Sequence, residues 1–101
     1  MRDVRRVPGV VVPRFGIVDF DVDVDAGGSA LYVSEGRFGR GAGPAAARLV
    51  VFTRARTGFV RVQRVGAITG FAEAPSLSSD GRTLYYHRRV GRRFGIYFVT
   101  R

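Results

Sequence analysis

Short runs rich in valine, isoleucine, phenylalanine and tyrosine alternate along this chain with clusters of glycine, proline, aspartate and serine. No stretch keeps an apolar period of 3.6 residues, so the pattern predicts strands and no helix. A long hairpin loop is expected between Gly36 and Ala47, where three glycines and Pro44 predict irregular structure. The expected strands cover residues 17–24, 30–34, 48–54, 59–65, 74–78, 83–88 and 94–100, with a further edge strand near 4–12.

Three blocks of sequence recur in the same order, which indicates an internal repeat. Glycines fall at tight reversals in both copies, in Gly27-Gly28 and in Asp80-Gly81, where a positive φ is needed. The chain is therefore interpreted as one domain, 1–101, with repeat one at about 4–54 and repeat two at about 62–101. The matching blocks are 77–86 with 24–33 (offset 53), 96–101 with 49–54 (offset 47) and 62–68 with 4–10 (offset 58).

The predicted strands of the second repeat are apolar on both faces. Leu84 and Tyr86 alternate with Tyr85 and His87. In the next strand Ile96 and Phe98 alternate with Tyr97 and Val99. A sheet with this pattern is typically covered on both sides, as in a stack of sheets around an axis.

The segment from Glu73 to Tyr86, Glu-Ala-Pro-Ser-Leu-Ser-Ser-Asp-Gly-Arg-Thr-Leu-Tyr-Tyr, is followed at 95–100 by Gly-Ile-Tyr-Phe-Val-Thr. Together they resemble the WD-repeat-like blade of TolB-type β-propellers, whose pattern is Pro-Ser-x-Ser-Pro-Asp-Gly, then a Leu-Tyr pair and an Ile-Tyr strand. Ser79 stands where the pattern has its second proline. The first copy is more degenerate, with Val22 and Gly27 at the positions of proline and aspartate. The resemblance covers roughly 17–54 and 62–101.

The resemblance implies an all-β fold of antiparallel four-stranded β-propeller blades, here two blades of an incomplete propeller. It also implies a bacterial, extracytoplasmic protein that uses the propeller as a non-catalytic scaffold for binding other proteins. An alternative is the non-catalytic propeller portion of a peptidase-type protein, in which another domain carries the catalysis.

Two blades do not close a ring, because propellers have typically 4–8. The expected partners are therefore other proteins, further blades or copies of this chain. The strand near 4–12 is expected to complete the blade that ends at Arg101. We expect the isolated chain to be either marginally folded or oligomeric, with three copies forming a six-bladed ring.

Composition narrows the remaining alternatives. The net charge is +9, and all 17 basic residues are arginine, a bias typical of GC-rich codons. The chain has no cysteine, which excludes disulfides and cysteine metal sites. The apolar run from Val7 to Pro13 is too short to span a membrane and lacks a signal-peptide cleavage site. The extracytoplasmic expectation therefore rests on the resemblance alone.

Four carboxylates alternate with apolar residues in the segment Asp19-Phe20-Asp21-Val22-Asp23-Val24-Asp25. On a regular strand they share one face, where crowded carboxylates suit a hard cation such as calcium. A calcium-loop interpretation fails because the required glycine and acid are replaced by Ala26 and Tyr32. We favour a solvent-facing row without metal, with Asp19, Asp21, Asp23 and Asp25 as weak candidate ligands.

Arg88, Arg89, Arg92 and Arg93 form a basic cluster in a predicted hairpin, with aromatic residues nearby. They are candidate anion-binding residues, and a nucleic-acid-binding module is a further, less favoured alternative. Nucleic-acid binding by a merely solvated cluster is expected to be weak and salt-sensitive.

His87 is the only histidine, and neither a nucleophile elbow nor a phosphate or dinucleotide motif accompanies it. The sequence therefore predicts a protein that is not an enzyme, with no catalytic residues and no cofactor.

Overall fold

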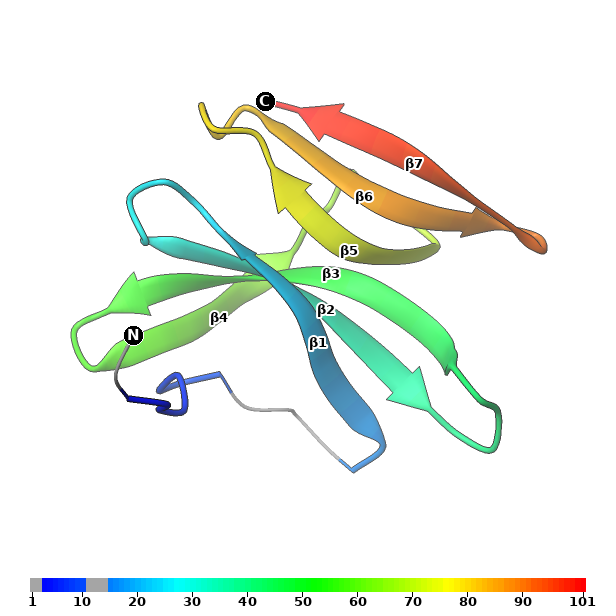
Figure 1. Ribbon diagram of the computed structural model, residues 1–101, viewed down its shortest axis with the longest axis horizontal. Helices are drawn as coiled ribbons and strands as arrows, with labels where there is room; N and C mark the ends of the chain where they lie inside the picture. The colour runs from blue at the N-terminus through cyan, green and yellow to red at the C-terminus, as the bar shows by residue number, and fades with distance from the viewer. Residues whose placement is uncertain (1–2, 11–14) are drawn as a thin grey trace.

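The computed structural model describes residues 3–10 and 15–101, which form two antiparallel sheets (Figure 1). Sheet A has the order β1-β2-β3-β4 and sheet B the order β5-β6-β7. The described residues contain no helix, and hence none that is able to cross a membrane. The strands are β1 (Ile17–Val24), β2 (Ala30–Phe38), β3 (Pro44–Ala55), β4 (Gly58–Arg64), β5 (Phe71–Leu77), β6 (Thr83–Val90) and β7 (Arg93–Thr100).

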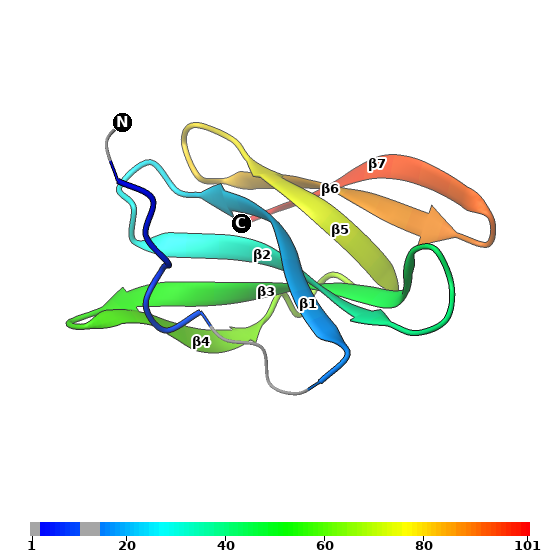
Figure 2. The ribbon, with the colours of Figure 1, turned by 60° about the horizontal axis from the view of Figure 1, so that its bottom comes forward.

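The all-β prediction is confirmed, and seven of the expected strands are present. Strands β2 and β3 extend further than expected, so the irregular loop of the long hairpin shrinks to residues 39–43. The edge strand expected near 4–12 is not formed over residues 3–10, and 11–12 lie outside the described residues. Instead, the Phe59 amide of β4 donates a hydrogen bond to the Pro8 carbonyl (2.8 Å), so this segment lies beside sheet A (Figure 2). The two sheets do not close into a ring.

The first hairpin of each sheet has the same turn. Gly28 and Gly81 have φ of 70° and 72°, as the sequence predicts. The carbonyl of each glycine accepts a hydrogen bond (2.9 Å) from an arginine Nε at the end of the neighbouring hairpin, Arg54 in sheet A and Arg101 in sheet B. The two hairpins thus make equivalent contacts at the predicted offsets of 53 and 47.

A bulge interrupts the first strand of each sheet at equivalent positions. Asp21 (φ 47°) lies between Phe20 and Val22 where β1 shifts register, and Ala74 (φ 56°) lies within the corresponding shift of β5. A bulge adds one residue against the partner strand, and so it reverses the faces on the two sides of it. In β1 and β5, odd-numbered residues before the bulge and even-numbered residues after it therefore lie on the same face.

Sheet B packs across one face of sheet A through β5, which lies against β1, β2 and β3. We call this surface of sheet A its joining face. It carries Tyr32 and Leu49, and the Ser34 Oγ accepts a hydrogen bond from the Ala74 amide (2.8 Å). The interface is apolar, and its buried members are Leu49, Ile68, Ala72, Leu84 and Tyr86, with Tyr32, Val65, Leu77 and Val99 packed around them.

The opposite surface, the far face of sheet A, carries a second apolar cluster. Val33, Val50 and Phe52 are 0–3% exposed there. They are packed against Val10 of the segment 3–10, and also against Leu31 and Phe59. Sheet A is therefore covered on both sides, as a strand pattern with two apolar faces requires.

The interface between the sheets predicts a contrast between two positions that the repeat makes equivalent. Leu49→Ala removes a buried side chain of the interface and is expected to lower the free energy of unfolding by about 2–5 kcal/mol. Ile96→Ala changes the counterpart in β7, which is 74% exposed, and is expected to alter the free energy by no more than about 0.5 kcal/mol. Urea unfolding followed by circular dichroism measures both, and equal effects would contradict this packing.

Candidate functional site

The row of aspartates does not share one face, and that expectation is wrong. The bulge at Asp21 places Asp19 opposite Glu35, whereas Asp23 lies opposite Tyr32 and accepts a hydrogen bond from the Leu77 amide of sheet B. Asp25 instead caps its turn, where Ser29 and the Ala30 amide donate to its carboxylate, and these bonds lower its pKa. Within the described residues no group of three or more acidic or histidine side chains is placed to hold a metal ion.

Glu35 is the buried acid of sheet A, with a side chain that is 1% exposed. Arg48 of β3 donates from Nε and Nη2 to one carboxylate oxygen (3.0 and 2.7 Å). Arg61 of β4 donates to the other oxygen, and its guanidinium lies 5.1 Å from the centre of the Phe52 ring. A buried carboxylate held by two guanidiniums ties three adjacent strands together.

Asp19 lies beside this ion pair on β1, and its Oδ1 is buried without a hydrogen-bond partner. Burial raises the pKa of Asp19, and the charge of Glu35 raises it further. Burial also disfavours the charge on Glu35, but hydrogen bonds and charges from Arg61 and Arg48 outweigh it and lower the pKa of Glu35. The pKa values of the two neighbouring carboxyls are thus shifted in opposite directions, up for Asp19 and down for Glu35.

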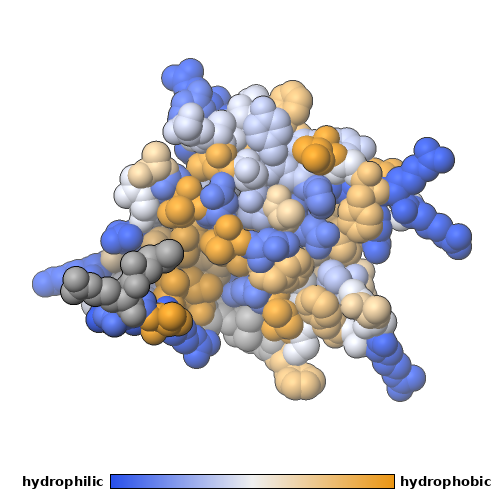
Figure 3. Space-filling model, in the orientation of Figure 1, coloured by the Kyte–Doolittle hydropathy of each residue, from blue (hydrophilic) through white to orange (hydrophobic). Residues whose placement is uncertain are grey.

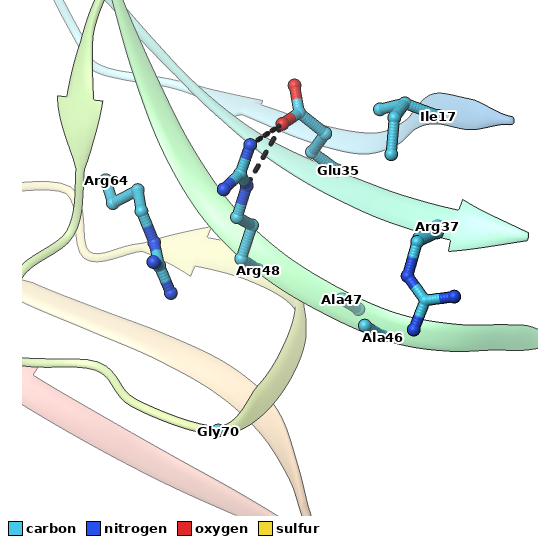
Figure 4. Close-up of a pocket in the computed structure, with 8 residues that line it drawn as sticks. All are labelled: Ile17, Glu35, Arg37, Ala46, Ala47, Arg48, Arg64 and Gly70. Atoms are coloured by element: carbon cyan, nitrogen blue, oxygen red, sulfur yellow. Dashed lines mark hydrogen bonds and ion pairs between the residues drawn. The ribbon is translucent and has the colours of Figure 1, made fainter. Parts of the chain in front are cut away.

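A cleft of about 590 Å³ opens beside this cluster, at the ends of β2 and β4 (Figure 4). Its wall carries Arg37 and Arg64 in addition to the Glu35–Arg48 pair, and Gly70 lies at its other side. The lining therefore has three arginines against one glutamate, so it is positively charged. Among the described residues its lining includes neither a histidine nor a hydroxyl side chain.

The predicted basic cluster is divided by the structure. Arg89 lies 4.2 Å above the Phe71 ring, whereas Arg88 lies on the opposite face of β6, 5.3 Å from the Tyr97 ring. Arg92 and Arg93 are exposed at the β6–β7 turn, where Figure 3 shows hydrophilic side chains projecting from the hairpin tip. The four arginines therefore do not form one anion-binding surface.

The outer surface of sheet B leaves several large apolar side chains uncovered. Ile96, Phe98 and Phe94 are 74%, 64% and 54% exposed, although each stands in the middle or start of a paired strand. We call this surface the free face of sheet B. It carries Phe71, Glu73, Ser76, Tyr85, His87, Arg89, Phe94, Ile96 and Phe98.

Aromatic contacts order the free face. Phe71 and Phe94 meet edge to face (5.9 Å between ring centres), and Tyr85 packs on Phe98 at the same distance. The exposed His87 ring lies 6.3 Å from that of Phe94. A preordered aromatic surface is suited to binding, because little side-chain freedom remains to be lost.

The sequence analysis missed the cluster around Glu35. The alternation of Val33 and Glu35 places the acid on an apolar face, which is a signal for a buried carboxylate. Its partners Arg48 and Arg61 become identifiable only when the pairing register of β2, β3 and β4 is known.

Comparison with known protein families, with curated proteins and with solved structures found no match to this chain.

The two carboxyls predict opposite effects on stability. Glu35→Gln is expected to cost about 1–3 kcal/mol at pH 7, because the two arginines lose a charged partner. The pKa of Glu35 is lowered by folding, so this difference is complete above the usual value of 4.5 and shrinks as the pH falls below it.

Asp19→Asn is expected to stabilise the protein by roughly 0.5–1 kcal/mol at pH 7, since it removes a disfavoured charge. The pKa of Asp19 is raised by folding, so the gain disappears as the pH falls toward its usual value of 3.8. Urea unfolding between pH 3 and 7 measures both variants, and effects of the same sign would contradict the assignment.

Proposed function

We propose that this chain is a non-catalytic interaction module that binds protein surfaces through the free face of sheet B. The observation that carries the proposal is the exposure of Phe94, Ile96 and Phe98 on an ordered strand pair. Contiguous exposed apolar surface of this kind typically marks a binding site. Aromatic side chains supply much of the binding energy at protein interfaces.

The resemblance to TolB-type blades agrees with this proposal. The equivalent turns and bulges of the two sheets support a repeat of two blade-like units. An extracytoplasmic location and a scaffold role in a larger propeller belong to the same proposal. A nucleic-acid-binding role has less support, because Arg88 and Arg89 lie on opposite faces of β6.

Peptide selection tests the binding surface without knowledge of the natural partner. A displayed library of random peptides is selected on the full chain, since peptides collect on surfaces that are prepared for binding. Ile96→Arg and Phe98→Arg are expected to weaken the selected peptides by tenfold or more, which corresponds to about 1.4 kcal/mol.

Val60→Arg is the matched control, because Val60 is also exposed (54%) but lies on β4. It is expected to leave peptide binding unchanged. Peptides that lose affinity equally with all three variants, or with none of them, would refute the free face as the binding site.

The same proposal predicts that the chain does not turn over peptide or ester substrates. His87 is exposed against Phe94, and no hydrogen bond joins it to a hydroxyl group among the described residues. Fluorogenic peptide and ester assays measure this directly. Turnover that disappears in the His87→Ala variant would overturn the non-catalytic assignment.

A further inference from the structure

The interface between the two sheets has a counterpart on each outer surface of the chain. The joining face of sheet A contributes Tyr32, Ser34 and Leu49 to that interface. At the repeat offsets of 53 and 47, these positions correspond to Tyr85, His87 and Ile96. All three counterparts lie on the free face of sheet B.

The second half of the interface is duplicated in the same way. Sheet B contributes Leu84, Tyr86 and Val99 to it. These correspond to Leu31, Val33 and Phe52, which lie together on the far face of sheet A.

The chain therefore carries one complete interface inside and one half of the same interface on each outer side. Inside the chain, the joining face of sheet A packs on the inner surface of sheet B. The free face resembles the first of these surfaces and the far face resembles the second, so the free face of one copy is suited to the far face of another. Such a contact between two copies joins different surfaces, so it is a head-to-tail contact that is able to extend or close into a ring.

The two outer halves differ in one respect. The free face of sheet B is open, whereas the apolar cluster on the far face of sheet A is covered by Val10, at the end of the segment 3–10 whose residues 3–9 are exposed. The cover is held by Val10 against the Val33–Val50–Phe52 cluster and by the hydrogen bond from Phe59 to Pro8. Gly9 permits this approach, since a Cβ at that position would lie 1.7 Å from the Phe59 carbonyl oxygen.

Resting on the proposed function, we propose that the partner of the free face is the far face of a second copy of this chain, exposed when the segment Asp3–Val10 leaves it. The segment competes with the second copy for the same apolar surface. Only the fraction of chains whose far face is uncovered is able to bind a second copy, and the apparent affinity falls in proportion to that fraction. The cover therefore sets the concentration at which copies associate.

Gly9→Ala tests the proposal in the full chain. The added methyl group cannot fit against Phe59, and the φ of 86° further disfavours alanine. The variant is expected to associate at a concentration at least about tenfold lower than the wild type, measured by light scattering during size-exclusion chromatography. Gly66→Ala is the matched control, because a Cβ there meets no atom within 4 Å, and it is expected to behave as the wild type.

Val10→Asp releases the cover by a second route, through the loss of its apolar contact with the far face. Ile96→Arg combined with either variant is expected to return the chain to the monomer, because it places a charge on the free face. Thermal unfolding of each variant establishes that the sheets remain folded.

Four outcomes overturn the inference. These are folded Gly9→Ala and Val10→Asp variants that stay monomeric, association that survives Ile96→Arg, a Gly66→Ala variant that associates like Gly9→Ala, and loss of cooperative unfolding in both cover variants, which would make the segment part of the core. Peptide selection on the free face is independent of the segment. The proposed binding function therefore stands or fails separately from self-association.

Discussion

A sheet with two apolar faces must be covered on both sides, and this requirement governs how the chain is arranged. Sheet A meets it with sheet B on its joining face and with the segment 3–10 on its far face. Sheet B meets it on one side only, so aromatic residues of β7 remain in contact with water. The surface proposed for binding is therefore a product of the same patterning that forms the core.

The sequence predicted much of the fold, because strand patterning and turn glycines are local signals. Seven strands and the positive φ at Gly28 and Gly81 are confirmed. The bulges were not predictable, since Asp21 and Ala74 are not residues that mark a positive φ. The missed bulge produced the wrong expectation that four aspartates share a face. The exposure of the free face followed from the repeat, but the position of the segment 3–10 did not, because it depends on contacts distant in sequence.

The buried ion pairs of sheet A all involve one acid, Glu35, while most of the other arginines are exposed. Glu35 binds two guanidiniums from adjacent strands, and burial together with the charge of Glu35 raises the pKa of the neighbouring Asp19. Removing one partner of a buried ion pair is strongly destabilising, because it leaves the other charge buried without compensation. A shift of β3 by one residue would place Arg48 on the joining face and leave Glu35 without half of its partners.

The bulge at Asp21 also determines how β1 tolerates a change in length. After the bulge along the chain, Val22 lies opposite Val33, and before it Asp19 lies opposite Glu35. A deletion of Asp21 alone would restore simple alternation and leave Phe20 opposite Ser34 and Val22 opposite Val33, so both faces of β1 would keep their residues. Among the positions of β1, Asp21 is thus the one where a frame-preserving loss of one codon would disturb the pairing with β2 least, because the residues on both sides of it keep their partners.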